Sequence, residues 1–331
     1  MRLDWASFLD LLRQSNRFIL TSHVRPDCDA LGSELGLLGV LETVGKSVRI
    51  VNAQATPATL AWMDPHRRIE SLESLDAADL GDFDCLIVLD TSAFAQLGAM
   101  AAVVRNARDR VLVIDHHVSE DDLSDRWFKD TASEATGRIV AEIAMRLGVS
   151  LTPEISTPLF AAIATDTGWF RFPSVTGETY RIASRLSDAG AEPASIYREL
   201  YEQESIARLH LVGHTLAGAT LSHDGAIITS IVRRTDMEQT GARGTDTEDL
   251  VNLTLAVRGT QVAVILIEQP DGTVKVSFRS RGHVDCALLA ASFGGGGHKA
   301  AAGAIFDGPF DTAADRVRAS VDAAWRAALL S

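Results

Sequence analysis

The segment RFILTSHVRPDCDALGS, residues 17–33, runs from an apolar stretch into a cluster of polar side chains. The run FIL is typical of a buried strand, and the following ALGSELGLLGVLETVG predicts a helix that ends at Gly45. Between the strand and the helix lie His23, Asp27 and Asp29. A strand that leads directly into a helix is the first part of a βαβ unit, which predicts a parallel sheet covered by helices.

The same alternation continues through the first half of the chain. Further strands are expected in SVRIVN, DCLIVLD and RVLVIDHH, where apolar residues are nearly continuous, as in parallel strands that are buried on both faces. Helices are expected in SEATGRIVAEIAMRLG, with Ser133 as its N-cap, and in TPEISTPLFAAIATDTG and GETYRIASRLSDAG. We therefore predict an α/β protein whose N-terminal domain has a doubly wound, mainly parallel sheet.

The second half of the chain has a different pattern. Residues 191–220 read as helical and rich in charge, and we expect them to link two domains. The runs QVAVILIEQ and TVKVSFRS flank a Pro-Asp-Gly turn, which is the pattern of a β-hairpin. We predict a catalytic domain over residues 1–190 and a smaller α/β domain over residues 221–331, with the catalytic cleft between them.

Composition restricts the classes of partner. The chain has 331 residues and a net charge of −13, so it lacks the basic excess with which proteins hold long nucleic acids. No apolar run approaches the roughly 20 residues of a membrane-spanning helix. The N-terminal segment has the pattern of an amphipathic helix and not of a signal peptide. Three cysteines far apart in sequence form no disulfide framework, which favours a cytoplasmic protein.

Polar side chains follow the predicted strands where each strand ends. The carboxyl ends of parallel strands lie at one edge of a sheet, where ligands bind. Three strand ends and one helix end place these residues there: His23, Asp27, Asp29, Asp90, Asp115, His116, His117 and Asp166. So many carboxylates raise one another's pKa unless cations compensate them. Carboxylate and imidazole donors favour Mn²⁺ or a similar octahedral ion, and their number fits a pair of ions that promotes displacement at phosphorus.

Each of these residues has a simpler explanation when it is taken alone. Asp29 could be only the N-cap of the helix that follows it, and adjacent histidines occur on surfaces without a function. Their joint position at three strand ends favours the metal site. Cys28 lies between two of the aspartates, and in an extended turn its side chain would point away from theirs. We expect Cys28 to be a packing residue and not a ligand.

Four motifs in order, SHVRPDCDALGS, VLDTS, DHH at residues 115–117 and TDTGWFRF, resemble those of the DHH superfamily of phosphoesterases. VSFRSRG and FGGGGHKAAAGA resemble its associated substrate domain. The pairing and the length are similar to the oligoribonuclease and pAp phosphatase subfamily, and the resemblance covers nearly the whole chain. It implies hydrolysis of very short RNAs to 5′-mononucleotides and removal of the 3′-phosphate of pAp.

The resemblance also implies a role for each site residue, with two Mn²⁺ as cofactors. The ligands of one ion would be His23, Asp27 and Asp90. The ligands of the other would be Asp29, Asp90, His116 and Asp166. Asp90 would then bridge both ions. Asp115 would orient a neighbouring ligand, and His117 would face the scissile phosphate.

The second domain is expected to hold the substrate. Arg279 can bind a phosphate with both prongs of its guanidinium, and Ser280 is its neighbour on the same strand. The glycine run allows backbone N–H groups to approach a phosphate closely. Its expected binding residues are Gly295, Gly296, Gly297 and His298. A flexible hinge remains the alternative for this run, and substrate contact is left open for Arg281 and Phe172.

Other functions share parts of this pattern. A cyclic-dinucleotide phosphodiesterase of the same fold would act on c-di-AMP or on its linear product pApA. A non-catalytic nucleotide sensor should have lost metal ligands, whereas each expected position here holds a competent residue. A family II inorganic pyrophosphatase shares the metal motifs but not a nucleotide-binding GGGH run. The expected partners are thus short RNA, dinucleotides and pAp, with no long nucleic acid and no membrane, and the resemblance is compatible with a homodimer.

Overall fold

The computed structural model describes residues 4–75, 80–118 and 120–329. The chain divides into two compact units, Met1–Gln203 and Glu204–Ser331. Among the residues described, no helix has both the length and the apolar character needed to cross a bilayer.

The segment predicted as a helical linker forms two separate helices. Helix α7 (Pro193–Tyr201) lies in the first unit and α8 (Ile206–Ala217) lies in the second. The side chain of Ser205 accepts a hydrogen bond from the N–H of Arg208 and caps the start of α8. An N-cap of this kind begins a new helix at the boundary between the units.

The first unit contains a six-stranded sheet in the order β3-β2-β1-β4-β5-β6, in which every neighbouring pair is parallel. The strands are β1 (Arg17–Thr21), β2 (Ser47–Asn52), β3 (Ile69–Ser71), β4 (Cys85–Leu89), β5 (Val111–Asp115) and β6 (Trp127–Lys129). The predicted doubly wound parallel sheet is confirmed. The direction of winding changes between β1 and β4, and the carboxyl ends at such a switch point are where open α/β sheets bind ligands.

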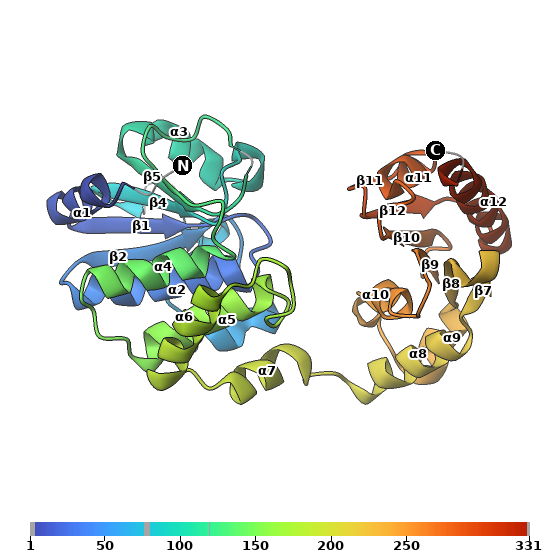
Figure 1. Ribbon diagram of the computed structural model, residues 1–331. Coiled ribbons are helices and arrows are strands. Elements are labelled where there is room, and N and C mark those ends of the chain that lie inside the picture. The colour runs from blue at the N-terminus through green and yellow to red at the C-terminus, as the bar shows by residue number, and fades with distance from the viewer. Residues whose placement is uncertain (1–3, 76–79, 119, 330–331) are drawn as a thin grey trace. The chain divides into compact units, whose positions relative to one another are not determined.

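Helices cover both faces of this sheet (Figure 1). They are α1 (Trp5–Gln14), α2 (Cys28–Thr43), α3 (Met100–Asn106), α4 (Thr136–Arg146), α5 (Pro153–Asp166) and α6 (Gly177–Asp188). Strand residues alternate between two cores: Leu20 and Ile87 pack with α2, α4 and α5, whereas Ile19 and Val88 pack with α3. Burial on both faces explains why the strand sequences are nearly continuous in apolar residues.

Helices α2 and α5 pack closely because glycines face the contact. A Cβ atom on Gly32 would lie 2.3 Å from the carbonyl oxygen of Pro158, and one on Gly39 would lie 2.6 Å from Ile155 Cγ1. The later position on α2 thus meets the earlier position on α5, so the two helices run antiparallel. The start of α2 therefore lies beside the end of α5, where Asp166 is located.

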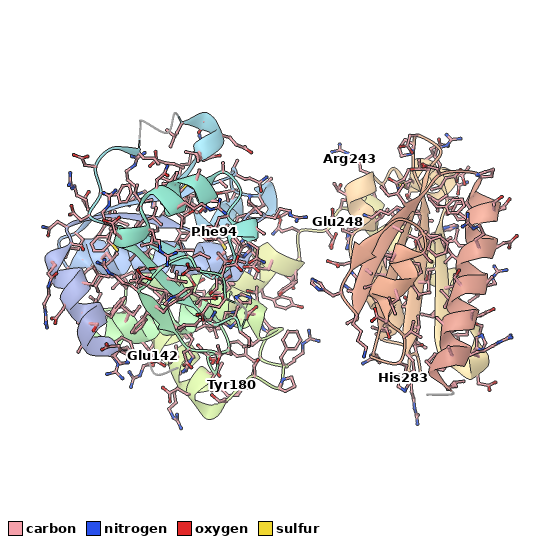
Figure 2. The ribbon with its side chains drawn as sticks, turned by 90° about the horizontal axis from the view of Figure 1, so that it is seen from above. Phe94, Glu142, Tyr180, Arg243, Glu248 and His283 are labelled. Carbon is pink, nitrogen blue, oxygen red and sulfur yellow. The ribbon has the colours of Figure 1, made fainter. Side chains whose placement is uncertain are left out.

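The second unit contains a mixed sheet in the order β11-β12-β10-β9-β8-β7, with only the β8–β9 pair parallel. The strands are β7 (Thr220–Ser222), β8 (Ile227–Val232), β9 (Val262–Glu268), β10 (Val274–Ser280), β11 (Gly296–Gly297) and β12 (Ala301–Phe306). The predicted hairpin is confirmed as β9–β10. Helix α12 (Phe310–Ala328) packs along one face of this sheet (Figure 2). The other face is covered by α8, α9 (Arg234–Thr240) and α10 (Leu250–Leu255), and α11 (Cys286–Ala291) precedes β11.

Candidate metal centre

Three neighbouring strands of the first sheet each deliver a candidate ligand at the carboxyl end. His23 follows β1, Asp90 follows β4 and His116 follows β5. Asp90 has a left-handed backbone with φ +59°, a conformation that aspartate adopts more readily than most residues. Its N–H donates to the carbonyl of Ile114 at 3.0 Å, so the pairing of β4 with β5 holds Asp90 in this conformation.

The first group of donors is formed by His23, Asp27 and Asp90, whose donor atoms lie within 4.8 Å of one another. Nε2 of His23 is 3.5 Å from Oδ2 of Asp90 and 3.9 Å from Oδ1 of Asp27. Nδ1 of His23 is 3.0 Å from the carbonyl oxygen of Val24, which orients the ring so that Nε2 faces the carboxylates. The N-cap of α2 is Asp27 and not Asp29, because Oδ1 of Asp27 accepts from two N–H groups of the first turn.

The second group is formed by Asp29, His116 and Asp166. Nε2 of His116 is 3.7 Å from Oδ2 of Asp29, 3.5 Å from Oδ2 of Asp166 and 3.6 Å from Oδ1 of Asp90. Nδ1 of His116 lies 3.2 Å from the carbonyl oxygen of Ser133, which fixes this ring as well. Asp90 thus presents one carboxylate oxygen to each imidazole.

The distances between these donor atoms fit shared coordination of a metal ion better than direct hydrogen bonds. They range from 3.5 to 3.9 Å, which is longer than a hydrogen bond. Ligands that each lie about 2.1 Å from one octahedral ion are roughly 3 Å apart at right angles and about 4 Å apart when opposite.

Asp29 also holds the start of helix α4. Its two carboxylate oxygens accept hydrogen bonds from the N–H groups of Thr136 and Gly137 at 2.7 and 2.8 Å. The prediction that Ser133 caps this helix is wrong: the N-cap is Ala135, and the Ser133 hydroxyl donates to the Ala135 carbonyl. A carboxylate from a distant part of the chain satisfies the donors of the first turn instead.

Burial makes the shared charge of these aspartates unfavourable. The pKa values of Asp29 and Asp90 lie well above the usual range, because burial penalises their charged forms and nearby carboxylates add repulsion. Burial also raises the pKa of Asp166. Positive charge placed among these carboxylates would remove the conflict, so the donor set and its electrostatics both fit divalent cations.

Asp115 differs from the other aspartates of the centre because hydrogen-bond donors of the protein contact both of its carboxylate oxygens. Oδ1 accepts from the backbone N–H of His117 at 3.1 Å and from Nδ1 of His117 at 2.9 Å. Oδ2 accepts from the hydroxyl of Ser92 and lies 3.3 Å from Nζ of Lys129. Burial alone would raise the pKa of Asp115, but the hydrogen bonds from His117 and Ser92 outweigh it and lower the pKa to about 2.

The partner of Asp115 differs from the sequence expectation. Asp115 was expected to orient a neighbouring metal ligand, yet it bonds to His117, while His116 is oriented by a backbone carbonyl. Asp90, His116 and His117 form a third group of possible donors, and Nδ1 of His117 lies 3.7 Å from Oδ1 of Asp90. Because this Nδ1 donates to Asp115, we assign His117 to the substrate and not to a metal. The ring of His117 is half-exposed, and its other nitrogen, Nε2, is not used in the bond to Asp115.

Cys28 lies in the hydrophobic core of the first unit and is 5% exposed. Burial, followed by the charge of Asp27, raises the pKa of its thiol to about 12. No group of potential metal donors within the described residues includes Cys28. The structure therefore agrees with its expected packing role.

We predict that the native protein resists thiol modification. Burial raises the pKa of Cys85 to about 12 and that of Cys286 to about 11, so all three thiols are protonated and buried at pH 8. A thiol-reactive disulfide dye should label the native protein slowly and should label three thiols in denaturant. Cys28→Ser should retain two equivalents of metal, and loss of one equivalent would identify the thiol as a ligand.

The two strand residues expected to bind substrate have unequal surroundings. Nε of Arg279 donates to Asn252 at 2.9 Å, and its Nη1 donates to the carbonyl of Phe278 at 3.0 Å. Ser280 is 6% exposed, and its hydroxyl accepts from the N–H groups of Gly282 and Val284. Ser280 therefore stabilises the turn after β10, and this geometry does not favour the expected role in substrate binding.

The last two glycines of the run form the short strand β11. Strand β11 pairs with β12, and a Cβ on Gly295 would lie 2.1 Å from the carbonyl oxygen of Gly303. Gly297 has φ +143°, and a Cβ there would lie 2.6 Å from the Cα of Ala302. These two glycines are thus required by the approach of the β12 backbone, whereas a Cβ on Gly296 would meet no atom within 4 Å. The exposed His298 begins the tight turn that joins β11 to β12.

Aromatic side chains after Asp166 pack mainly on one another. Trp169 makes an edge contact with Tyr197, with ring centroids 5.0 Å apart. Phe170 stacks on Tyr180, which lies at the surface of the first unit (Figure 2). Phe172 is 49% exposed and covers the backbone of Gly168.

Sequence reasoning missed the residues that support the centre. Thr136 donates its hydroxyl to Oδ1 of Asp90 at 2.9 Å, and Ser92 and Lys129 hold Asp115. Ser92 stands within the quoted motif VLDTS, so its position after the strand was a usable signal. Lys129 carries no such signal, because a lysine next to apolar residues normally indicates an exposed position.

Comparison with known proteins agrees with this architecture. Residues 17–163 match the N-terminal domain of the DHH family, and residues 224–327 match the DHHA1 domain. Bifunctional oligoribonuclease and PAP phosphatase NrnA of Thermus thermophilus is 32% identical over 91% of this chain and 88% of its own length. The protein of the same name from Bacillus subtilis is 28% identical over 86% and 88%. The crystal structure of an exopolyphosphatase-related protein from Bacteroides fragilis matches with a TM-score of 0.85 and 27% identity, covering 98% of this chain and 96% of that one.

Proposed function

The chain belongs to the DHH family, and from this premise we propose that it is a metal-dependent phosphoesterase that hydrolyses very short oligoribonucleotides to 5′-mononucleotides and pAp to AMP. The two NrnA relatives, named for both activities, align over most of their length and so support this pair of substrates. The net charge of −13 also suits short substrates, because a long nucleic acid would need a basic surface.

The observation that carries this proposal is the position of Asp90: its Oδ2 lies 3.5 Å from Nε2 of His23 in the first donor group, and its Oδ1 lies 3.6 Å from Nε2 of His116 in the second. His23 and Asp27 would complete the set for one ion, and Asp29, His116 and Asp166 would complete the set for the other. The absence of a thiol from both groups favours Mn²⁺ over ions that prefer sulfur. When bound, the two ions would activate water and neutralise charge that develops on the phosphoryl oxygens.

The protein's own residues supply orientation and a proton. His117 is held through Nδ1 by Asp115, so Nε2 is the atom that would donate to a phosphoryl oxygen or to the leaving group. The hydrogen bond to Asp115 raises the pKa of His117, which favours the protonated form that can donate. In the second unit, the proposed contacts to the nucleotide are Arg279, Gly296 and His298. The guanidinium of Arg279 can bind phosphate with two N–H groups. Gly296 has open space beside it, and His298 is exposed.

The test compares substrates on the purified protein loaded with Mn²⁺. We expect pApA to give AMP as its only nucleotide product, and pAp to give AMP and inorganic phosphate. A 24-nucleotide RNA and inorganic pyrophosphate should be cleaved slowly or not at all. If neither pApA nor pAp is hydrolysed, the proposed function is wrong. c-di-AMP is tested beside them, and faster turnover of c-di-AMP than of pApA would establish the cyclic-dinucleotide alternative. Tight binding of nucleotides without turnover would indicate a sensor.

A further inference from the structure

A buried lysine lies behind the histidine proposed to face the phosphate. Lys129 is the last residue of β6, and its side chain is 3% exposed. Strand pairing places it directly opposite Asp115 at the end of β5. Its Nζ donates to Oγ of Ser92 at 2.8 Å and lies 3.3 Å from Oδ2 of Asp115, while Oε2 of the half-exposed Glu120 is 3.9 Å away.

Stability alone gives a poor reason for this arrangement. Burial of an ion pair costs desolvation that its attraction often fails to recover, and apolar residues of similar volume are frequently as good or better. Lys129 and Asp115 are both almost fully buried, at the edge of a centre already crowded with charge. On the same face of β5 and β6, the preceding side chains Val113 and Trp127 pack in an apolar core.

The contacts of Lys129 lead to His117 in two steps. Lys129 and Ser92 both hold Oδ2 of Asp115, and Ser92 bonds to each of the other two. Oδ1 of Asp115 then accepts both the backbone N–H and the Nδ1 of His117. A carboxylate held at one oxygen has a fixed plane, so its other oxygen holds the imidazole in one orientation.

We propose that Lys129 is a positioning residue for hydrolysis: through Asp115 it fixes the ring of His117 and thereby aims Nε2 at the substrate. This inference rests on the proposed function, because it assigns a purpose to His117 in that reaction. The polar contacts given for Lys129 within the described residues run to Ser92, Asp115 and Glu120, none of which is a proposed metal ligand. The proposed role is therefore exerted through Asp115.

The test is a double-mutant cycle with K129M and H117A, measured in steady-state turnover of pApA with Mn²⁺. K129M should lower kcat by about 10- to 100-fold, the usual cost of losing a supporting partner, and should leave KM within about threefold. In the H117A background K129M should have almost no further effect, because the group through which it acts is already absent. Metal content should stay at two equivalents in every variant.

Two further variants keep the inference falsifiable if K129M folds poorly. K129R retains a cation and should recover part of the lost kcat. S92A removes the other donor to the same carboxylate oxygen, and its effect should also disappear in the H117A background. K46M is the matched control. Lys46 lies just before β2, away from the carboxyl ends of the strands, and its Nζ donates to the carbonyl of Ser15. Its replacement should leave kcat unchanged.

The outcomes separate this inference from the proposed function. The positioning role alone is overturned if K129M has the same kcat as the wild type. It is also overturned if K129M lowers kcat by the same factor with and without His117. Loss of a metal equivalent from folded K129M also overturns it, because Lys129 would then support the ions. A wild type that hydrolyses none of the substrates overturns the proposed function, and this inference with it.

Discussion

Replacement of Asp90 by alanine is expected to lower the turnover of pApA by at least about 10³-fold. Among the described residues, Asp90 is the only carboxylate that shares one group of possible metal donors with His23 and another with His116. Its loss should therefore weaken both proposed metal sites, whereas loss of Asp27 or Asp166 should affect one. Metal analysis of the purified variant should show fewer than two equivalents of Mn²⁺, and initial rates with saturating Mn²⁺ should stay low.

Asp84→Asn provides the matched control, because Asp84 lies just before the same strand, β4, at its opposite end. The Asp84 carboxylate binds Arg17 and two backbone N–H groups, and these bonds lower its pKa to about 2. Asp84→Asn should keep both metal equivalents and full turnover. Near-normal turnover by Asp90→Ala, with two ions bound, would disprove the shared-ligand assignment.

Much of the fold could be predicted because its signal is local. Continuous apolar runs identified β1, β2, β4 and β5, and the same runs fixed the edge of the sheet where their polar neighbours gather. Two short parallel strands, β3 and β6, were missed. Neither has the continuous apolar pattern, since β6 reads WFK and ends in the buried Lys129. Such strands form only because a neighbour in the sheet offers backbone partners, which a local pattern does not reveal.

The ligand cluster was predictable for the same reason, but its supporting bonds were not. Strand ends converge in any parallel sheet, so His23, Asp90 and His116 could be placed together from sequence. The capping of α4 by Asp29 joins positions more than a hundred residues apart, and nothing near Ser133 indicates it. Tertiary contacts of this kind replace the local cap that the sequence favours.

The glycine run is a case in which only the structure shows why each glycine is needed. Phosphate binding, a hinge and close backbone packing all require glycine. The sequence favours phosphate binding over a hinge, because His298 follows the run and the strand with Arg279 precedes it. The structure explains Gly295 and Gly297 by the approach of β12 and leaves Gly296 beside open space. Of the three glycines expected to bind substrate, Gly296 therefore remains for the proposed contact.

Removal of divalent ions is expected to lower the melting temperature of the first unit by about 10–20 °C at pH 8. Two sites occupied at about a hundred times their dissociation constants contribute roughly 5 kcal/mol, and a domain of this size shifts by about 2–4 °C per kcal/mol. Calorimetry with Mn²⁺ and with a chelator measures this difference. Equal melting temperatures in the two conditions would contradict the existence of the proposed sites.

The metal-free protein should also lose stability as pH rises from about 4 to 8. The folded pKa values of Asp29, Asp90 and Asp166 lie above the unfolded value, chiefly because of burial, so the folded state binds these protons more tightly. Stability from such groups is present at low pH and is lost as pH rises through the raised pKa. Buried Glu34, with its pKa raised to about 7, adds a loss of about 3 kcal/mol of the same sign. Below pH 4 the sign reverses, because Asp115 has a lowered pKa of about 2.

Asp90→Asn connects this electrostatic argument to the metal site. The amide oxygen can still accept the hydrogen bond from Thr136, but one repelling charge is gone. In the presence of chelator at pH 8 the variant should therefore melt at a higher temperature than the wild type, although it is inactive. Mn²⁺ should raise its melting temperature less than it raises that of the wild type, because a shared ligand is missing. A lower melting temperature than the wild type in chelator would mean that the Asp90 carboxylate stabilises the fold by itself, and the case for a cation at this position would lose its electrostatic basis.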